Sequence, residues 1–277
     1  MKREQFGNAI EFCAIVNARS GRCSMDCRFC AQSVHYETKI ESYPLIDEDV
    51  LVSETQKQWQ RGIRRIGWVT SGRSVDNNDV TKIVAVAKRC HGGRLCASLG
   101  RLDRDALLKL KEAGISRYHH NLETSETFYP NVCATQRWSD RWATVLLAKN
   151  LGLEVCCGGL FGMGETWKDR YDLAIVLREI GVDSVPINFL NPIPGTPFAD
   201  RPILSVEEAL RIIVLFRLLL PKASIRICGG RPTTFGNRQS EILNAGADAL
   251  MTGDYLTTSG ITPEKDFQMF RKTEPQS

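Results

Sequence analysis

The sequence LCASLGRLDRDALLKLKEAGISRYH occupies residues 95–119. It begins with a short apolar run, Leu95–Leu99, which a helical pattern follows over residues 103–113. Gly114 ends this pattern, and a second apolar run, Ile115–His119, comes directly after it. An apolar strand, an amphipathic helix that ends at glycine and another apolar strand together make the repeating unit of a parallel sheet.

This unit recurs along the chain. The apolar or β-branched runs that we predict to be strands are Phe12–Asn17, Ile66–Ser71, Leu95–Leu99, Ile115–His119, Leu153–Gly159, Ser184–Phe189, Ser224–Cys228 and Ala247–Thr252. Predicted helices cover residues 77–90, 103–113, 139–151, 166–180 and 205–219. Eight strands that alternate with helices favour an α/β fold with a single (βα)8 TIM-type barrel, and a doubly wound open sheet is the alternative.

Composition agrees with one globular unit. The chain has 277 residues, of which 43% are hydrophobic and 25% charged. We expect a single barrel domain over residues 1–277, with a short N-terminal lead-in over 1–10 and a C-terminal extension from about 254 to 277. The net charge of +4 provides no case for a nucleic-acid footprint. No apolar run approaches the roughly 20 residues of a membrane span, and the N-terminus lacks the apolar core of a secretory signal, so we expect a cytoplasmic protein.

Three of the ten cysteines are clustered. Cys23, Cys27 and Cys30 form a Cys-x3-Cys-x2-Cys pattern on the loop after the first strand, at the catalytic face of a barrel. A structural zinc takes four ligands, and the nearby Cys13 lies in the strand, from which its side chain could not easily reach this loop. An iron–sulfur cluster held by only three cysteines keeps one iron open for an external ligand. The pattern therefore favours iron–sulfur over zinc.

This spacing resembles the radical S-adenosylmethionine (SAM) superfamily, whose fold is a full or partial βα barrel. The resemblance implies that Cys23, Cys27 and Cys30 hold a [4Fe–4S] cluster whose open iron binds SAM. One electron then cleaves SAM to a 5′-deoxyadenosyl radical, which takes hydrogen from an unactivated C–H bond. Phe29 matches the aromatic residue that packs on the adenine, although an aromatic side chain in this position also fits a simple packing role.

Within that superfamily the chain resembles the biotin synthase family over nearly its whole length. The matching segments are 13–33, 35–38, 121–125, 157–159, 162–166, 185–188 and 225–228. The resemblance implies insertion of sulfur into dethiobiotin, with an auxiliary iron–sulfur cluster deep in the barrel as sulfur donor. It also implies flavodoxin or ferredoxin as electron donor, and members of this family are commonly homodimers.

The auxiliary site departs from the usual family pattern of three cysteines and one arginine. Cys96, Cys156 and Arg226 match three of these positions, but Gly67 stands where the second strand has its cysteine. Cys228 lies two residues after Arg226 and shares its strand face. We expect Cys228 to replace the ligand that is missing at Gly67. Whether the cluster is [2Fe–2S] or larger is not determined by this pattern. Burial as ordinary core thiols is the alternative for Cys96 and Cys228.

Binding residues for SAM and dethiobiotin follow from the same resemblance. Asn121 and Glu123 correspond to the family's Asn and Asp on the fourth strand, and the acidic residue binds the ribose of SAM. Asn188 matches an Asn beside the dethiobiotin ring. His119 replaces an Asn that helps to hold the ureido group, and filling of the barrel interior is its alternative role.

The other residues singled out have weaker signals. Gly158 and Gly159 would let the backbone approach SAM, although glycines serve simple barrel packing as well. Cys156 and Cys157 point in opposite directions on one strand, and Cys156 is the predicted ligand. We expect the remaining cysteines to be structural or surface thiols, namely Cys13, Cys90 and Cys133.

Two other functions remain open at this point. A maturase or carbon-skeleton mutase of the same superfamily would share the barrel and the triplet, but it would have no use for a deep sulfur-donor site at Cys96, Cys156 and Cys228. A non-catalytic iron–sulfur or zinc sensor would have no use for adenine and ribose contacts. SAM binding to the reconstituted protein separates the sensor from the enzymes.

Overall fold

The computed structural model describes residue 7 and residues 10–271, and the predicted lead-in and extension fall partly outside this range, at 1–6, 8–9 and 272–277. Within the described residues, nine parallel strands form one sheet. They are β1 (Glu11–Arg19), β2 (Arg65–Thr70), β3 (Arg94–Ser98), β4 (Ile115–His119), β5 (Glu154–Cys156), β6 (Gly159–Phe161), β7 (Ser184–Phe189), β8 (Ser224–Ile227) and β9 (Ala249–Met251).

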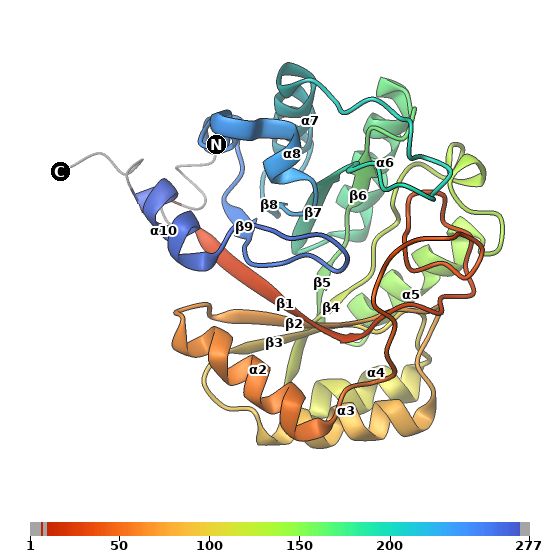
Figure 1. Cartoon of the computed structure of the whole chain (residues 1–277), viewed down its shortest axis with the longest axis vertical. Coiled ribbons are helices and arrows are strands. Elements are labelled where there is room, and N and C mark those ends of the chain that lie inside the picture. Colours follow the sequence, from red (N-terminus) through yellow and green to blue (C-terminus); the bar gives the residue numbers. More distant parts are fainter. Residues whose placement is uncertain (1–6, 8–9, 272–277) are drawn as a thin grey trace.

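The sheet closes on itself. The strand order is β5-β4-β3-β2-β1-β9-β8-β7-β6, and β5 also pairs with β7 through Cys156 and Ser184. Strands β5 and β6 thus share one of the eight places around the barrel, and helices lie outside the strands (Figure 1). The (βα)8 barrel is confirmed, and the open-sheet alternative is wrong because the last strand, β9, pairs with the first, β1.

Helices alternate with the strands. They are α2 (Glu48–Gln60), α3 (Asn77–Arg89), α4 (Arg104–Glu112), α5 (Trp138–Asn150), α6 (Trp167–Ile180), α7 (Val206–Leu219), α8 (Arg231–Phe235), α9 (Glu241–Asn244) and α10 (Pro263–Arg271), with 3-10 turns η1 (Tyr129–Asn131) and η2 (Gly236–Arg238). All five predicted helices are present, with ends within one residue of the prediction. Side chains cap their N-termini where the sequence offers them: Asp76, Asp103 and Ser205 each accept a backbone N–H of the first turn.

Helix α2 was not predicted. Its only buried side chains are Leu51, Thr55 and Trp59, spaced four residues apart on one narrow face. The Thr55 hydroxyl accepts a hydrogen bond from Trp68 Nε1 at 2.8 Å, so α2 is held against β2 by a polar contact as well as by packing. A stripe this narrow gives little helical periodicity in the sequence.

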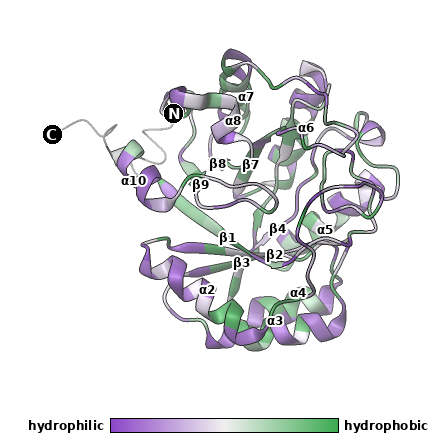
Figure 2. Cartoon of the chain, in the orientation of Figure 1, coloured by the Kyte–Doolittle hydropathy of each residue, from purple (hydrophilic) through white to green (hydrophobic). Residues whose placement is uncertain are grey.

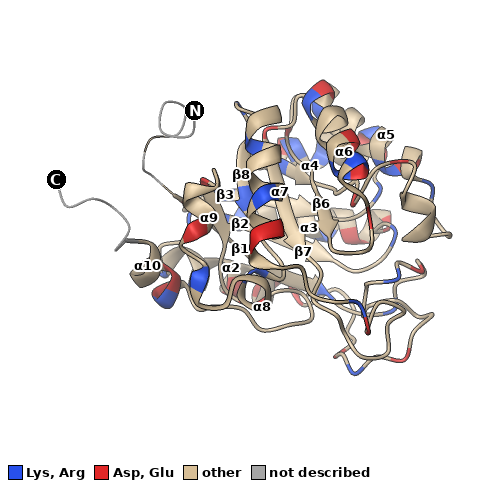
Figure 3. Ribbon diagram, turned by 90° about the horizontal axis from the view of Figure 1, so that it is seen from above, with Lys and Arg blue, Asp and Glu red and all other residues tan. Residues whose placement is uncertain are grey.

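The core lies between the barrel wall and its helices. Figure 2 shows that helices such as α2 and α3 carry both hydrophilic (purple) and hydrophobic (green) residues, as expected for helices that pack on one face. Basic and acidic segments are interspersed along the outer helices of the described chain (Figure 3). None of the helices in the described residues has the length and apolar character needed to cross a bilayer.

Candidate active site

A cavity of about 400 Å³ lies inside the barrel and opens at the carboxyl ends of the strands. Every residue that the sequence singled out for the site lines it, except two glycines that are described below. Parallel strands in a barrel all end at one face, so side chains far apart in the sequence meet there. The cavity has a loop end, near the cysteine triplet, and a deep end, near the amino ends of the strands.

The cysteine triplet lies on the loop between β1 and α2. Cys23 and Cys27 are buried, Cys30 is half-buried, and all three line the cavity. The loop folds back on itself: Cys23 N donates to Gln32 O at 2.9 Å, and Cys30 N donates to Cys27 O at 2.9 Å. Burial raises the pKa of the Cys30 thiol to about 11, so a bound metal would be needed to hold it as a thiolate at neutral pH. Phe29 lines the cavity beside them.

A turn after β4 anchors this loop. The carboxylate of Asp26 accepts hydrogen bonds from Thr135 Oγ1 at 2.7 Å, from the backbone N–H groups of Ala134 and Thr135 at 3.0 Å each, and from Cys133 Sγ at 3.2 Å. Cys133 is 3% exposed and also hydrogen-bonds with Cys27. It is therefore a buried neighbour of the triplet and not a surface thiol, and nothing in the spacing of the sequence signals this contact.

Glu123 and Asn121 lie at the end of β4. Glu123 has φ of +71°, an uncommon conformation for a residue with a side chain. Its carboxylate lies 3.6 Å from Arg141 Nη1 and accepts from Asn121 Nδ2 at 3.4 Å. Burial raises the pKa of Glu123, and the Arg141 guanidinium opposes this rise. The residues thus offer a positioned hydrogen-bond acceptor in the cavity, and Arg141 is a site residue that the sequence did not indicate.

Gly158 and Gly159 do not line the cavity. A Cβ atom on Gly158 would lie 2.0 Å from the carbonyl oxygen of Pro186, and one on Gly159 would lie 2.5 Å from the carbonyl oxygen of Glu123. Gly158 N also donates to Asn121 Oδ1 at 3.1 Å. Because these two residues have no side chain, the backbone can pack closely where β5 passes into β6. The bond from Gly158 N then holds the Asn121 side chain in position.

Asn188 and His119 occupy the middle of the cavity wall. Asn188 Nδ2 donates to Gly159 O at 3.2 Å, and its Oδ1 accepts from Gly229 N at 3.0 Å, so the amide is held in one orientation. An amide has two N–H donors and two acceptor lone pairs, which leaves capacity for a ligand. Burial lowers the pKa of His119 to about 4, and this side chain is neutral at pH 7.

The predicted auxiliary residues meet at the deep end. Cys96, Cys156, Cys228 and Arg226 come from β3, β5, the end of β8 and β8 itself, and all of them line the cavity. Cys157 is fully buried on the outer side of the wall and does not line it. Gly67 also lines the cavity, and a Cβ atom there would make ordinary contacts, at 3.6 Å from Ile15 and 3.9 Å from Cys96.

Cys13 joins these residues, although we expected it to be a structural or surface thiol. It lines the same cavity and is 9% exposed. Burial raises the pKa of Cys13, attraction to Arg226 lowers it, and the proximity of Cys156 raises it. The signal that would have found it is the alternation along β1, on which Cys13, Ile15 and Asn17 share one face.

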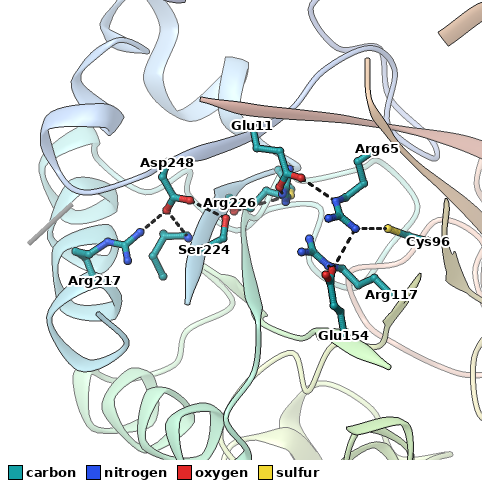
Figure 4. A network of polar contacts seen from close by, with 11 residues as sticks. Glu11, Arg65, Cys96, Arg117, Glu154, Arg217, Ser224, Arg226 and Asp248 are labelled. Atoms are coloured by element: carbon teal, nitrogen blue, oxygen red, sulfur yellow. Dashed lines mark hydrogen bonds and ion pairs between the residues drawn. The ribbon is translucent and has the colours of Figure 1, made fainter. Parts of the chain in front are cut away.

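Beneath the thiols lies a network of charges (Figure 4). Glu11 accepts from Arg65 Nε at 2.8 Å and also pairs with Arg226. Glu154 pairs with Arg117 at 2.9 Å and with Arg65 at 3.3 Å. Three guanidinium groups therefore face two carboxylates, and this network has one excess positive charge.

Two donors of this network have no partner. The Nη1 groups of Arg117 and Arg226 are buried and make no hydrogen bond. A buried donor without an acceptor costs free energy, so an anionic group at this position would be stabilised. Arg65 Nη1 already donates to Cys96 Sγ at 3.5 Å. The deep end thus has the donors, the charge and the thiols that an anionic iron–sulfur cluster requires, and the residues present fit such a group.

Among the described residues, no three His, Cys, Asp or Glu side chains lie close enough together to hold a single metal ion. For the loop end, the fit to a cluster rests on the chemistry of the donors. Three cysteine side chains border one cavity, which also contains an aromatic side chain and a buried carboxylate.

Comparisons with known proteins agree with this geometry. The family model described as the radical SAM superfamily matches residues 18–177, and that of the biotin and thiamin synthesis associated domain matches residues 186–276. Curated relatives named biotin synthase include one from Desulfovibrio desulfuricans, 49% identical over 94% of this chain and 83% of that protein. Another, from Pelotomaculum thermopropionicum, is 48% identical over 97% of this chain and 85% of that protein.

Solved structures of other enzymes share the fold. Methylornithine synthase superposes with a TM-score of 0.76 at 23% identity, over 90% of this chain and 74% of that one. The FeFe-hydrogenase maturase HydG from Carboxydothermus hydrogenoformans superposes with a TM-score of 0.83 at 17% identity, over 98% of this chain and 68% of that one.

Proposed function

Because this chain belongs to the biotin synthase family of the radical SAM superfamily, we propose that it converts dethiobiotin to biotin by inserting sulfur. The observation that carries the proposal is the 49% identity to a biotin synthase over 94% of the chain. The cavity supports it, since the cysteine triplet, the polar binding residues and the deep thiols border one volume of about 400 Å³. The enzyme is accordingly a radical SAM sulfurtransferase.

Cys23, Cys27 and Cys30 are the proposed ligands of a [4Fe–4S] cluster. Three cysteines leave one coordination position for SAM. When bound, the cluster and SAM supply a one-electron cleavage that yields a 5′-deoxyadenosyl radical, and the auxiliary cluster supplies the sulfur. Asp26 and the turn at residues 133–135 hold the triplet loop over the cavity.

The cavity wall is proposed to bind and orient both small molecules. Glu123, held between Asn121 and Arg141, accepts hydrogen bonds from the ribose hydroxyls of SAM, and Phe29 packs on the adenine. Asn188, already fixed by two backbone contacts, pairs with the cyclic urea of dethiobiotin. Neutral His119 and Asn121 border the same space and contact dethiobiotin there.

Cys96, Cys156, Cys228 and Arg226 are proposed to form the site of the auxiliary cluster, whose nuclearity is [2Fe–2S] or larger. Support comes from their meeting in one cavity and from the excess positive charge beneath them. Gly158 acts on the SAM site through its hydrogen bond to Asn121, and Gly159 through its close approach to the carbonyl oxygen of Glu123.

We also propose the remaining partners and the organisation of the chain. Flavodoxin or ferredoxin delivers the electron, the protein is cytoplasmic, and two copies form a homodimer. Residues 1–277 form one domain, because β7, β8 and β9 complete the same barrel as β1 to β6 and share its core.

Replacement of Cys27 by Ala tests the radical cluster. Two thiolates do not hold a cluster with one defined open iron, so 5′-deoxyadenosine formation should fall to that of iron-free protein. The measurement is 5′-deoxyadenosine per chain after anaerobic reconstitution with a chemical reductant. Cys90→Ala, at the end of α3 and away from the cavity, is the matched control and should retain it. Retained SAM cleavage in the Cys27 variant would contradict the assignment.

Replacement of Cys228 by Ser tests the auxiliary site separately. The variant should keep the radical cluster and cleave SAM, because its triplet is intact, yet it should lose auxiliary iron and form little biotin. Iron content and biotin yield per chain measure this. Cys157→Ser, on the other side of the wall, should change neither. Full iron content and biotin yield in the Cys228 variant would mean that this thiol only packs.

A further inference from the structure

The deep end of the cavity has one thiol more than the resemblance assigns. Cys13, Cys96, Cys156 and Cys228 come from four different strand positions and are between 4% and 9% exposed. All four border the same volume. The fourth, Cys13, lies at the amino-terminal part of β1, far from the cysteine triplet in the loop.

Strand register places Cys13 level with Cys228. Cys13 pairs with Met251 of β9, and Arg226 of β8 pairs with Ala249 of the same strand. Ile227 pairs with Leu250, the residue before Met251, so Cys228, which directly follows β8, comes to the height of Met251. The two thiols therefore flank β9 at one height. Burial raises the pKa of Cys228, and the proximity of Cys13 raises it further.

Gly67 has no side chain to place in the cavity beside the deep thiols. Gly67 lies on the neighbouring strand β2, one layer above the Cys13–Arg65 pair. An added Cβ would lie 3.6 Å from Ile15 and 3.9 Å from Cys96, which are ordinary contacts. The position of the missing second-strand cysteine is therefore beside Cys96, and Cys13 lies two residues nearer the amino end on the adjacent strand.

Arg226 forms an ion pair, and this makes it unsuited to bind a metal directly. Its guanidinium forms an ion pair with Glu11, which keeps it protonated, and a protonated guanidinium has no lone pair to donate. Its free Nη1 donor and that of Arg117 suit hydrogen bonds to sulfur on an anionic cluster. In this network Arg226 supplies charge and donors, and another residue is needed as fourth ligand.

We propose that Cys13, and not Arg226, is the fourth protein ligand of the auxiliary cluster. With Cys96, Cys156 and Cys228 it completes the four-cysteine set that iron–sulfur clusters commonly take. Each thiol loses its proton to solvent on binding iron, and Arg226 stabilises the resulting anion. The inference rests on the proposed auxiliary cluster and specifies which residues hold it.

The test isolates the auxiliary site in the full-length chain. In a background where Cys23, Cys27 and Cys30 are all Ala, iron and sulfide per chain report the auxiliary cluster alone. Adding Cys13→Ala should lower the iron retained after anaerobic reconstitution and desalting at least threefold. Adding Arg226→Lys, which keeps a cation opposite Glu11, should leave most of it. Electron paramagnetic resonance of the reduced samples should change with the Cys13 substitution.

Cys157→Ala is the matched control, since it removes a thiol that is also buried but does not line the cavity. Circular dichroism and the thermal midpoint show whether each variant is folded. Unchanged iron in a folded Cys13 variant, or loss of iron only with Arg226→Lys, overturns the inference. Failure of the proposed function looks different: the wild-type chain would then form no biotin, while the Cys13-dependent iron in the triple-alanine background would still be found.

Discussion

Asn188 shows how a single barrel residue is prepared for a ligand. Its amide bonds to Gly159 O and Gly229 N hold the group in one orientation before anything binds. A pre-oriented group loses little rotamer freedom on binding, which favours affinity. The same two contacts join the ends of β6, β7 and β8 around the cavity.

Replacement of Asn188 by Ala should weaken dethiobiotin binding by about 1–3 kcal/mol, because part of a buried urea loses its hydrogen bonds. This corresponds to a roughly 5- to 150-fold higher Kd, measurable by calorimetry on the reconstituted enzyme. Asn188→Asp keeps the acceptor for Gly229 N and removes the amide donor, including its bond to Gly159 O, so it tests the donor separately from the acceptor. Weakened SAM binding with unchanged dethiobiotin binding would assign Asn188 to the other ligand.

At the scale of elements, the connection from β6 to α6 depends on one buried carboxylate. Glu165 accepts from Gly162 N at 3.0 Å and from Met163 N at 2.8 Å, and it pairs with Arg170 of α6 at 2.8 Å. Arg170 in turn pairs with Glu208 of α7 at 2.6 Å. One carboxylate thus fixes the loop and links two helices to the barrel.

Glu165→Ala should lower the free energy of unfolding by about 3–5 kcal/mol, because the buried Arg170 would lose its buried partner and keep only Glu208, and the loop amides would lose their acceptor. Urea denaturation of the protein measures this. The matched control is Glu264→Ala, which breaks an exposed pair with Arg61 and should have little effect. Equal effects of the two substitutions would contradict a buried role for Glu165.

Another element-scale feature is the division of one predicted strand, Leu153–Gly159, into β5 and β6. Cys157 N bonds to Ser184 O, while Gly158 O accepts from Leu122 N and Glu123 N. The chain therefore changes partners between two strands within a few residues. Alternation still holds through Cys156 and Cys157, so the sequence placed these two thiols on opposite sides of the wall, as the structure has them.

At the scale of the whole molecule, Glu11 of β1 connects β2 on one side of the β1–β9 pair with β8 on the other side. It pairs with Arg65 of β2 and with Arg226 of β8, so it joins the first and last parts of the barrel. Burial alone would raise the pKa of Glu11, but attraction to Arg226 and Arg65 lowers it to about 2 from 4.5. A carboxylate with a lowered pKa stabilises the fold above its unfolded-state pKa.

The barrel should therefore lose stability as the pH falls from about 4.5 toward about 2, while Glu11 is progressively protonated. Thermal midpoints of the wild type and of Glu11→Gln across this range measure the contribution. The variant should be less stable than the wild type at pH 7, and the difference between the two should shrink on acidification. A difference that stays constant down to pH 2 would show that Glu11 does not couple barrel closure to pH.

The sequence by itself determined the barrel and much of the site. Local patterns carry this information: the strand–helix units, glycines after helices such as Gly114, and the spacing of the triplet all arise within a few residues of chain. Strand alternation also placed Arg226 and Cys228 on one face. The resemblance then supplied the roles of residues that are scattered over successive strand ends.

Only the tertiary structure decided which distant groups meet. Asp26 and Cys133 are 107 residues apart, and Glu11 and Arg226 are 215 apart, so no periodicity connects them. The location of Cys13 in the lumen likewise depends on barrel closure, which brings β9 and β8 beside β1. Local patterns specify which face of a strand a side chain occupies, whereas the packing of the closed barrel selects its partners across the lumen.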